Sequence, residues 1–473
     1  MRISARYRSR FAQCSIIQGL IITEARMDGY RIGGGQVGAT TRDAHSHNTC
    51  CFQINVANRK QDTMKDLDGK GKKICFFGHF GSPNFGNEIT LQAMLYHVRR
   101  VLPNAEVGCI CTGPDALAAT QKIETVPIRR IFVKCEKRRS RLARLLRSVL
   151  IGVPSELYRW LEAFKTLNGS DMLIIPGTGL LTDAYGLLSW GPYNLFKWSV
   201  MARMCRCKVF FVSVGAGPVY SALGKYFVKS ALSLADFRSY RDNASFNYLK
   251  GIGFSTNSDR IYPDLVFSLP EAMLPRDSDE RTKRSIIGLG LMPHAGKYSS
   301  ATAGDKIYRE YLKNLVAFAR WLLTHDYDIR LLMGDLGDRA ALEQFKSLLK
   351  ASWGAYDGKR IINQPALSVE QLLPQIAATD IVVATRFHNI VLAFLLNKPV
   401  ISISFHHKCA SLMEEMELSE YCHDINDMNA DRLIAQFLDL EKKATRLKPA
   451  IREKVEQSRQ ALGEQYSLIF KDV

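Results

Sequence analysis

The stretch ATDIVVATRFHNIVLAFLLNKPVISISFHHK, residues 378–408, indicates the fold class of this 473-residue chain. It contains two short apolar runs, DIVVAT and PVISISF, and a helical pattern between them that begins near Asn389. Short apolar runs that alternate with helical segments are typical of βαβ units, in which the strands are parallel. The stretch therefore predicts part of a parallel sheet.

The same alternation extends over most of the chain and divides into two series. The first series begins at Lys72 and the second near Ser285, and the polar stretch 269–283 between them reads as a linker. The second series ends in two helical segments, 429–443 and 450–468. We expect an α/β protein with two Rossmann-like parallel-sheet domains, residues 71–270 and 271–473, facing a central cleft.

Residues 1–70 form a predicted N-terminal extension with little structure. Residues 1–63 show no lasting periodicity, and Met64 is soon followed by the strand-like run KKICFFG. An arginine-rich targeting segment, an upstream extension and a misplaced start all remain open for residues 1–63.

Charge and cysteine content limit which partners and which cellular compartment are expected for the protein. Lys and Arg number 64 against 46 Asp and Glu, a formal net charge of +18, which attracts anionic partners. The 11 cysteines are odd in number and scattered, so we expect a reducing, cytoplasmic compartment and no metal site. No run of 18 apolar residues occurs, so any membrane contact is expected to be peripheral.

A basic segment carries much of this excess charge. Residues 129–147 contain nine Lys or Arg and one acid, Glu136, and apolar residues continue to position 150. The pattern predicts a basic amphipathic helix over 129–150, which either lies on the inner face of an anionic membrane or packs on the first domain. No nucleic-acid partner is expected, because no motif for one accompanies the charge.

Glycine-containing stretches follow three predicted strands of the first series. They provide the candidate substrate-loop residues Asn84, Gly86, Asn87, Gly177, Gly179 and Gly215. Glycine lets a ligand approach the backbone closely, and it also suits tight turns, so each stretch is informative only together with the others.

Four cationic side chains complete the candidate site. Arg386 and His388 follow the strand DIVVAT and would share one face of an extended chain, and Lys408 follows the next strand. Arg241 precedes Asp242 at the start of a helical stretch. The alternatives are that Arg386 pairs with an acid, that His388 caps a helix beginning at Asn389, and that Arg241 and Asp242 form a surface pair.

Taken in order, several motifs resemble the polysaccharide pyruvyl transferase family over about residues 72–425. These motifs are GSPNFGNE, DMLIIPGTGLLTD, VSVGAGP, SYRDNAS, YPDLVF and TRFHNIVLAFLLNKPVISISFHHK. The sequence departs from the family pattern at Asn87, at Thr178 and at Phe405 to His407.

The resemblance implies a glycosyltransferase-B-like arrangement, with residues 71–270 on the acceptor side and residues 271–473 on the donor side. It also implies transfer of a pyruvyl group, as a ketal, in polysaccharide, exopolysaccharide or glycoconjugate biosynthesis. Phosphoenolpyruvate would be the donor and co-substrate, no cofactor would be needed, and the acceptor would be a saccharide, free or lipid-linked. The family's donor-binding cations fall on Arg386 and His388, with Arg241 as a third.

Within that chemistry, Arg386, Arg241 and Lys408 would hold the carboxylate and phosphate of the donor, and His388 would either donate the proton or stabilise the departing phosphate. The sequence does not identify the base, and Asp183 and Glu88 are candidates only because they lie beside loops at the cleft edge. Alanine at Arg386 or His388 should stop phosphate release while leaving the fold intact. The alternatives are a nucleotide-sugar-dependent glycosyltransferase and a catalytically silent saccharide-binding relative of the same fold.

Overall fold

The computed structural model describes residues 71–130, 148–184, 186–187, 191–275, 284–293, 301–353, 358–405 and 407–471. The predicted extension 1–70, most of the basic segment 129–150, part of the linker and His406 lie outside these residues. All described residues belong to one unit, Asp68–Val473.

The first sheet follows from the buried apolar runs of the first series. It contains seven parallel strands in the order β3-β2-β1-β4-β5-β6-β7. The strands are β1 (Lys73–Gly78), β2 (Glu106–Cys111), β3 (Glu124–Pro127), β4 (Met172–Pro176), β5 (Lys208–Val214), β6 (Phe237–Tyr240) and β7 (Arg260–Ile261). The helices between them are α2 (Phe85–Val101), α3 (Pro114–Gln121), η1 (Ser148–Gly152), α5 (Val153–Leu167), α6 (Pro192–Met204), α7 (Ala222–Ser233) and α8 (Asn243–Gly251).

The second sheet has six parallel strands in the order β10-β9-β8-β11-β12-β13. They are β8 (Ile286–Gly290), β9 (Asp328–Leu332), β10 (Ile361–Ile362), β11 (Ile381–Ala384), β12 (Val400–Ser404) and β13 (Cys422–Asp424). The longer helices are α9 (Ala301–Thr324), α10 (Arg339–Trp353), α11 (Val369–Ala377), α12 (Phe387–Leu395), α13 (His407–Glu415) and α14 (Ala430–Phe470), and short helical turns are η2 (Leu265–Ser268), η3 (Glu271–Met273), η4 (Leu336–Asp338), η5 (Gly358–Arg360), η6 (Ser419–Tyr421) and η7 (Ile425–Asp427).

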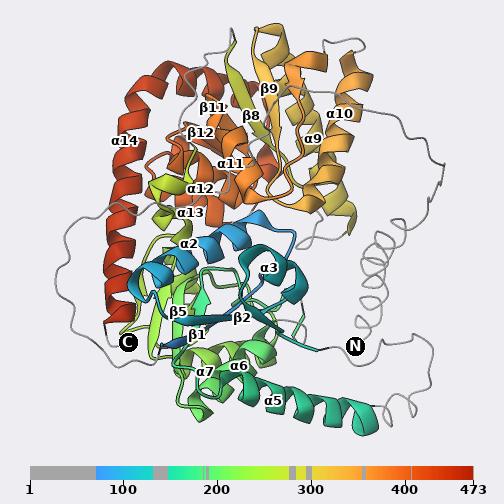
Figure 1. The fold of residues 1–473 in the computed structure, drawn as a ribbon. Helices are drawn as coiled ribbons and strands as arrows, with labels where there is room; N and C mark the ends of the chain where they lie inside the picture. Colours follow the sequence, from blue (N-terminus) through green and yellow to red (C-terminus); the bar gives the residue numbers. More distant parts are fainter. Residues whose placement is uncertain are drawn as a thin grey trace, which may run out of the picture. The chain divides into compact units, whose positions relative to one another are not determined.

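Two parallel α/β sheets, one from each series, confirm the predicted fold class (Figure 1). The central strands β4 and β8 are buried along their whole length, as expected when helices cover both faces of a parallel sheet. The domain boundary near residue 270 remains a prediction.

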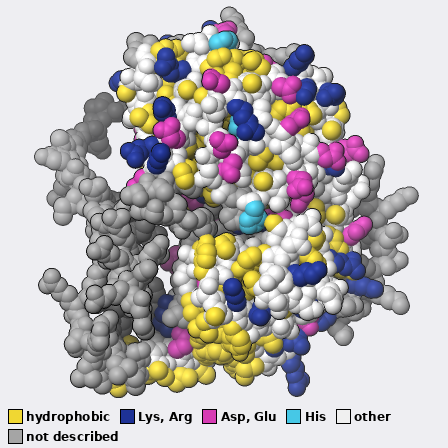
Figure 2. Space-filling model, turned by 180° about the vertical axis from the view of Figure 1, so that it is seen from behind, with side chains coloured by type: hydrophobic (Ala, Val, Ile, Leu, Met, Phe, Trp, Pro, Cys, Tyr) yellow, Lys and Arg dark blue, Asp and Glu magenta, His cyan; other side chains and the backbone are white. Residues whose placement is uncertain are grey.

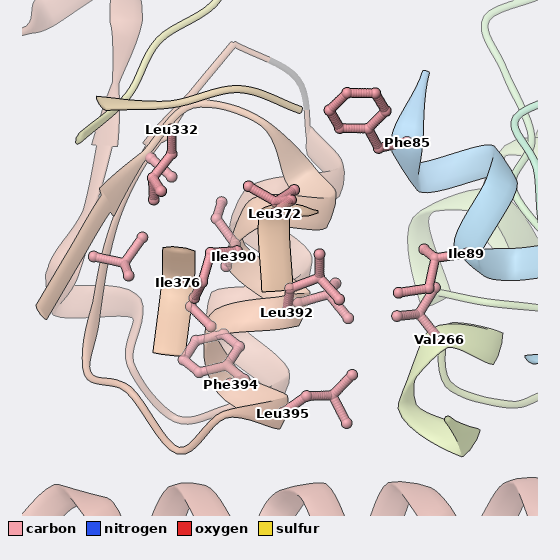
Figure 3. Packing of buried hydrophobic residues seen from close by; sticks show 14 of the residues in the cluster. Phe85, Ile89, Val266, Leu332, Leu372, Ile376, Ile390, Leu392, Phe394 and Leu395 are labelled. Atoms are coloured by element: carbon pink, nitrogen blue, oxygen red, sulfur yellow. The ribbon is translucent and has the colours of Figure 1, made fainter. Parts of the chain in front are cut away.

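An apolar core joins the two sheets. Phe85 and Ile89 of α2 lie on the side facing Leu372 of α11 and Leu392 of α12, with Val266 of η2 beside them (Figure 3). Backbone hydrogen bonds add to this contact, from the amide of Phe85 to the carbonyl of Gly334 at 3.1 Å and from that of Leu336 to Pro83 at 3.1 Å. The start of α2 is therefore fixed against the second sheet.

The C-terminal segments form one helix, α14, rather than the two expected from the sequence. The helix continues through Pro449 and runs alongside both sheets (Figure 1). Near its end, Gln465 accepts a hydrogen bond from Ser239 of β6, at 2.5 Å, and Tyr466 stacks on His97 of α2, with ring centroids 4.2 Å apart. The helix that begins in the second domain thus packs on the first.

The strand orders determine where a ligand site is expected. In each sheet the order in which successive strands are added reverses next to the first strand, between β1 and β4 and between β8 and β11. In open α/β sheets, ligands bind at the carboxyl ends of the strands beside this switch point. Gly177 follows β4 and Arg386 follows β11, so the candidate residues fall at both switch points.

Candidate active site

The first predicted substrate loop is the beginning of a helix. Asn84 caps α2, since its side-chain oxygen accepts hydrogen bonds from the amides of Gly86, at 3.0 Å, and Asn87, at 3.3 Å. A Cβ atom on Gly86 would lie 1.8 Å from Nδ1 of His388, far inside contact distance. Gly86 is therefore the point where α2 meets the predicted catalytic histidine of the second domain.

His388 lies in the first turn of α12, which begins at Phe387 with Arg386 as N-cap. The prediction that Arg386 and His388 share a face of an extended chain is therefore wrong, and so is the alternative of a helix starting at Asn389. The Nε2 atom of His388 is buried and has no hydrogen-bond partner among the described residues. Burial lowers the pKa of His388 to about 4, so its ring is neutral at pH 7; the negative charge of Asp264 opposes this shift, and the positive charges of Arg241 and Lys408 add to it.

Arg386 forms an ion pair, which was the alternative to a role in donor binding. Its Nε lies 3.0 and 3.1 Å from the two carboxylate oxygens of Asp338, and Nη2 also donates to that group. Asp338 is fully buried and accepts a further bond from the amide of Gly334. A buried carboxylate in this geometry orients the guanidinium. Removal of the arginine would leave the carboxylate buried without a partner and would destabilise the fold.

Arg241 is buried, unlike the partly exposed Arg386, and so the alternative of a surface pair is wrong. Its Nε lies 3.4 Å from Asp242, the N-cap of α8, and its Nη1 lies 3.3 Å from Asp264. Its guanidinium carbon lies 4.8 Å from the centre of the Phe387 ring. A Cβ on Gly215 would lie 2.8 Å from Nη2, so Gly215 leaves room for this arginine.

Lys408, in the first turn of α13, reaches the loop that follows β4. Its ammonium nitrogen would lie 3.0 Å from a Cβ on Gly179. Burial and the positive charge of Arg241 lower the pKa of Lys408 to about 7, while Asp242 opposes the shift. The structure therefore brings Gly179 together with Lys408, Gly215 with Arg241, and Gly86 with His388. Gly177 lies two residues before Gly179, against the carbonyl of Ser213.

Three aspartates, Asp242, Asp264 and Asp338, lie among these cations and were not predicted as site residues from the sequence. Asp264 and Asp338 pair with arginines that are distant in sequence. Only the pair of Arg241 and Asp242, which are neighbours in the chain, could be predicted from the sequence. The site is therefore a network of alternating charges rather than an isolated cationic pocket.

Two further buried polar side chains at the site were also missed. The Oγ1 atom of Thr178 and both amide atoms of Asn389 are buried and have no hydrogen-bond partner among the described residues. The amide of Asn389 lies against Gly290 and Gly334, at the ends of β8 and β9. Unpaired buried polar atoms are costly, so groups of this kind beside a site indicate ligand contacts.

The two predicted bases differ in their surroundings. Asp183 accepts three hydrogen bonds from the start of α7, from the amides of Tyr220 and Ser221 and the hydroxyl of Ser221. Burial alone would raise the pKa of Asp183, but these bonds outweigh it and hold the pKa below its usual value. Burial, with a contribution from Glu370, raises the pKa of Glu88 to about 7.

Two cavities lie apart from this network, along α14. One, of about 540 Å³, lies between α14 and α2, and the other, of about 810 Å³, lies around Pro449.

Within the described ranges, no group of three or more His, Cys, Asp or Glu side chains could hold a metal ion. None of the helices in the described part of the chain is long and apolar enough to cross a bilayer.

Comparisons with known proteins agree with this architecture. A family model described as polysaccharide pyruvyl transferase matches residues 84–407. None of the curated proteins compared with the sequence matches it. Among solved structures, Anabaena HepE in complex with UDP is similar with a TM-score of 0.51 and 15% identity, covering 84% of this chain and 99% of that one. The UDP-GlcNAc 2-epimerase of Neisseria meningitidis, bound to UDP-GlcNAc, has a TM-score of 0.51 and 11% identity, covering 85% and 98%. At these identities the structural likeness shows the fold alone.

Proposed function

The chain belongs to the polysaccharide pyruvyl transferase family, and from this premise we propose that it transfers the pyruvyl group of phosphoenolpyruvate to two hydroxyls of a saccharide. As a member of this family it is an enzyme. The donor, the saccharide and the residue roles below are parts of the proposal.

The surroundings of His388 are the main support for this proposal. His388 presents a buried Nε2 without a partner among the described residues, at the contact between the domains; the charges of Arg241, Lys408 and Arg386 lower its pKa and that of Asp264 raises it. A neutral imidazole beside cations becomes protonated when an anion binds, because the anion favours the charged form. The arrangement therefore suits a ligand that brings negative charge and then needs a proton.

Phosphoenolpyruvate has both properties. We assign Arg241, Arg386 and Lys408 to its carboxylate and phosphate, since a guanidinium has five N–H donors and recognises such groups by paired hydrogen bonds. Asp242, Asp264 and Asp338 orient the two arginines. The unpaired Thr178 and Asn389 then provide neutral hydrogen bonds at the edge of the same site.

The reaction would proceed in two additions. His388 protonates the methylene carbon, C3, and the first sugar hydroxyl adds to C2, so that the π bond is replaced by a C–H and a C–O bond. The C2–O bond to phosphate then breaks, and the second hydroxyl adds to C2 to form the ketal. The two hydroxyl protons balance the proton gained by C3 and the one taken by the departing phosphate.

Titration during donor binding tests the role of the histidine. The pKa is about 4 for His388 and about 7 for Lys408. Without ligand at pH 7, the imidazole is therefore neutral and the lysine is about half protonated. Binding of phosphoenolpyruvate raises both pKa values, so between one and two protons should be taken up per donor bound. Calorimetry in buffers of different ionisation enthalpy measures this number. His388→Ala should lower the uptake, and equal uptake in the two proteins would refute the assignment.

Glu88 is the better candidate for the base that deprotonates the sugar. It lies in the first turn of α2, two residues after Gly86, and its pKa of about 7 allows it to accept a proton at neutral pH. Glu88→Gln should lower turnover by about 10²-fold or more and remove the rise in rate through pH 7.

Glu370→Gln provides the matched control for Glu88. Glu370 raises the pKa of Glu88 through its negative charge, so its neutralisation should shift the rise in rate to lower pH without abolishing turnover. An unchanged pH profile in both variants would exclude Glu88 as the base.

Donor choice distinguishes this proposal from its two alternatives. Purified protein should release phosphate from phosphoenolpyruvate in the presence of a saccharide from a panel of galactosides, glucosides and N-acetylhexosamines, with a product heavier by the pyruvyl ketal. Turnover of a nucleotide sugar instead would indicate a glycosyltransferase, and saccharide binding without any turnover would indicate a silent relative.

A further inference from the structure

The outer side of α5 is apolar and exposed to solvent. Val153, Leu157, Leu161 and Phe164 recur every three or four residues, so they form one stripe along the helix. Leu157 and Leu161 are 63% and 60% exposed, although the opposite side of the helix packs on α6. A stripe of large apolar side chains in water is unusual for a surface helix and indicates a partner.

The neighbouring helices extend this apolar surface. α7 also packs on α6 and exposes Leu223 and Tyr226, and Met204 at the end of α6 is 65% exposed. Figure 2 shows hydrophobic side chains gathered at the level of α5, α6 and α7 in Figure 1. We call this surface, comprising Leu157, Leu161, Phe164, Met204, Leu223 and Tyr226, the α5–α7 face.

The charges around the α5–α7 face are one-sided. The three helices contain six Lys or Arg and two acids, Glu156 and Glu162. Glu156 pairs with Arg159 and Lys197, and Glu162 pairs with Arg130. Both acids are therefore paired, as Arg203 is with Asp236 at the end of α6, whereas Lys165, Lys225 and Lys229 form no ion pair with another described residue. The sequence just before η1 is also strongly basic.

We infer that the α5–α7 face docks on an anionic lipid bilayer. An apolar stripe flanked by cations and tyrosines is the composition of helices that lie in the membrane interface, where apolar side chains enter the acyl boundary and cations contact acidic headgroups. A second copy of the chain fits less well, because a symmetric contact would place two basic surfaces against each other.

The α5–α7 face is connected to the candidate site. Tyr220, next to α7, donates its amide to Asp183, and Asp183 follows the loop that contains Gly177 and Gly179. Docking would thus place the loop after β4, which contains Gly177 and Gly179, near the bilayer, and this position suits a saccharide attached to a lipid. This last step rests on the proposed function, whereas the docking itself does not.

Vesicle binding tests the docking directly. The full chain should sediment with vesicles of phosphatidylcholine and phosphatidylglycerol and bind at least about ten-fold more weakly to vesicles of phosphatidylcholine alone. The double variant Leu157→Glu, Leu161→Glu should lose the same binding by at least about ten-fold. Raising the salt from about 0.1 M to about 1 M should also weaken it, because the Debye length falls from about 10 Å to about 3 Å.

The control is Leu348→Glu, Leu438→Glu, which changes two exposed leucines on α10 and α14 and should bind as the unchanged protein does. Failure of the unchanged protein to bind anionic vesicles, or equal binding by the Leu157 and Leu161 variant, would overturn the inference. A dimer that is seen by light scattering and that the Leu157 and Leu161 variant dissociates would also overturn it.

Phosphate release with a water-soluble saccharide should persist in the Leu157 and Leu161 variant. If the unchanged protein releases no phosphate, that result would count against the proposed function and not against docking.

Discussion

Replacement of His388 by alanine is expected to lower phosphate release from phosphoenolpyruvate by a factor of about 10² to 10⁴, the range for loss of a general acid. The fold should be retained, because the Nε2 atom has no partner that the substitution would leave unpaired. The rate is measured with a saccharide acceptor, and thermal unfolding checks stability. His325→Ala, at an exposed histidine of the second domain, is the control and should leave turnover unchanged.

Arg386→Ala is a poorer test than the sequence suggested. Asp338 is fully buried against Arg386, so alanine would leave an unpaired carboxylate, at a cost of about 3 to 5 kcal/mol. Loss of turnover in that variant would not separate donor binding from folding. Turnover within a few-fold of normal in a folded His388→Ala protein would disprove the catalytic role of His388.

Substitution of Gly86 by alanine should lower turnover by about 10²-fold or more, although alanine favours a helix more than glycine does. The new Cβ would lie 1.8 Å from Nδ1 of His388, so the ring or the contact between the domains must move. A displacement of about 1 Å at reacting groups costs about 10²-fold in rate. Turnover and the affinity for phosphoenolpyruvate are the measurements.

Gly463→Ala is the matched control for Gly86. Gly463 lies in α14 and a Cβ there meets nothing within 4 Å, so alanine should be tolerated and should stabilise the helix by up to about 1 kcal/mol. If Gly86→Ala and Gly463→Ala are equally active, the close contact between α2 and His388 has no catalytic importance.

The sequence alone determined the two parallel sheets, because a buried strand between helices is a local property of a short apolar run. It also predicted the start of α8, where Asp242 caps the helix, since a cap is made within a few residues. The glycines at Gly86, Gly179 and Gly215 were located in sequence, but not the side chains that need the space beside them.

The tertiary structure decided the charge network, because its partners lie far apart in the chain. Arg386 meets Asp338 across 48 residues, and His388 meets Gly86 only when the two domains pack together. The path of α14 onto the first sheet depends in the same way on buried contacts of Gln465 and Tyr466. Local patterns specify helices and strands, whereas the pairing of buried charges and the fit between domains are set by packing that no single segment contains.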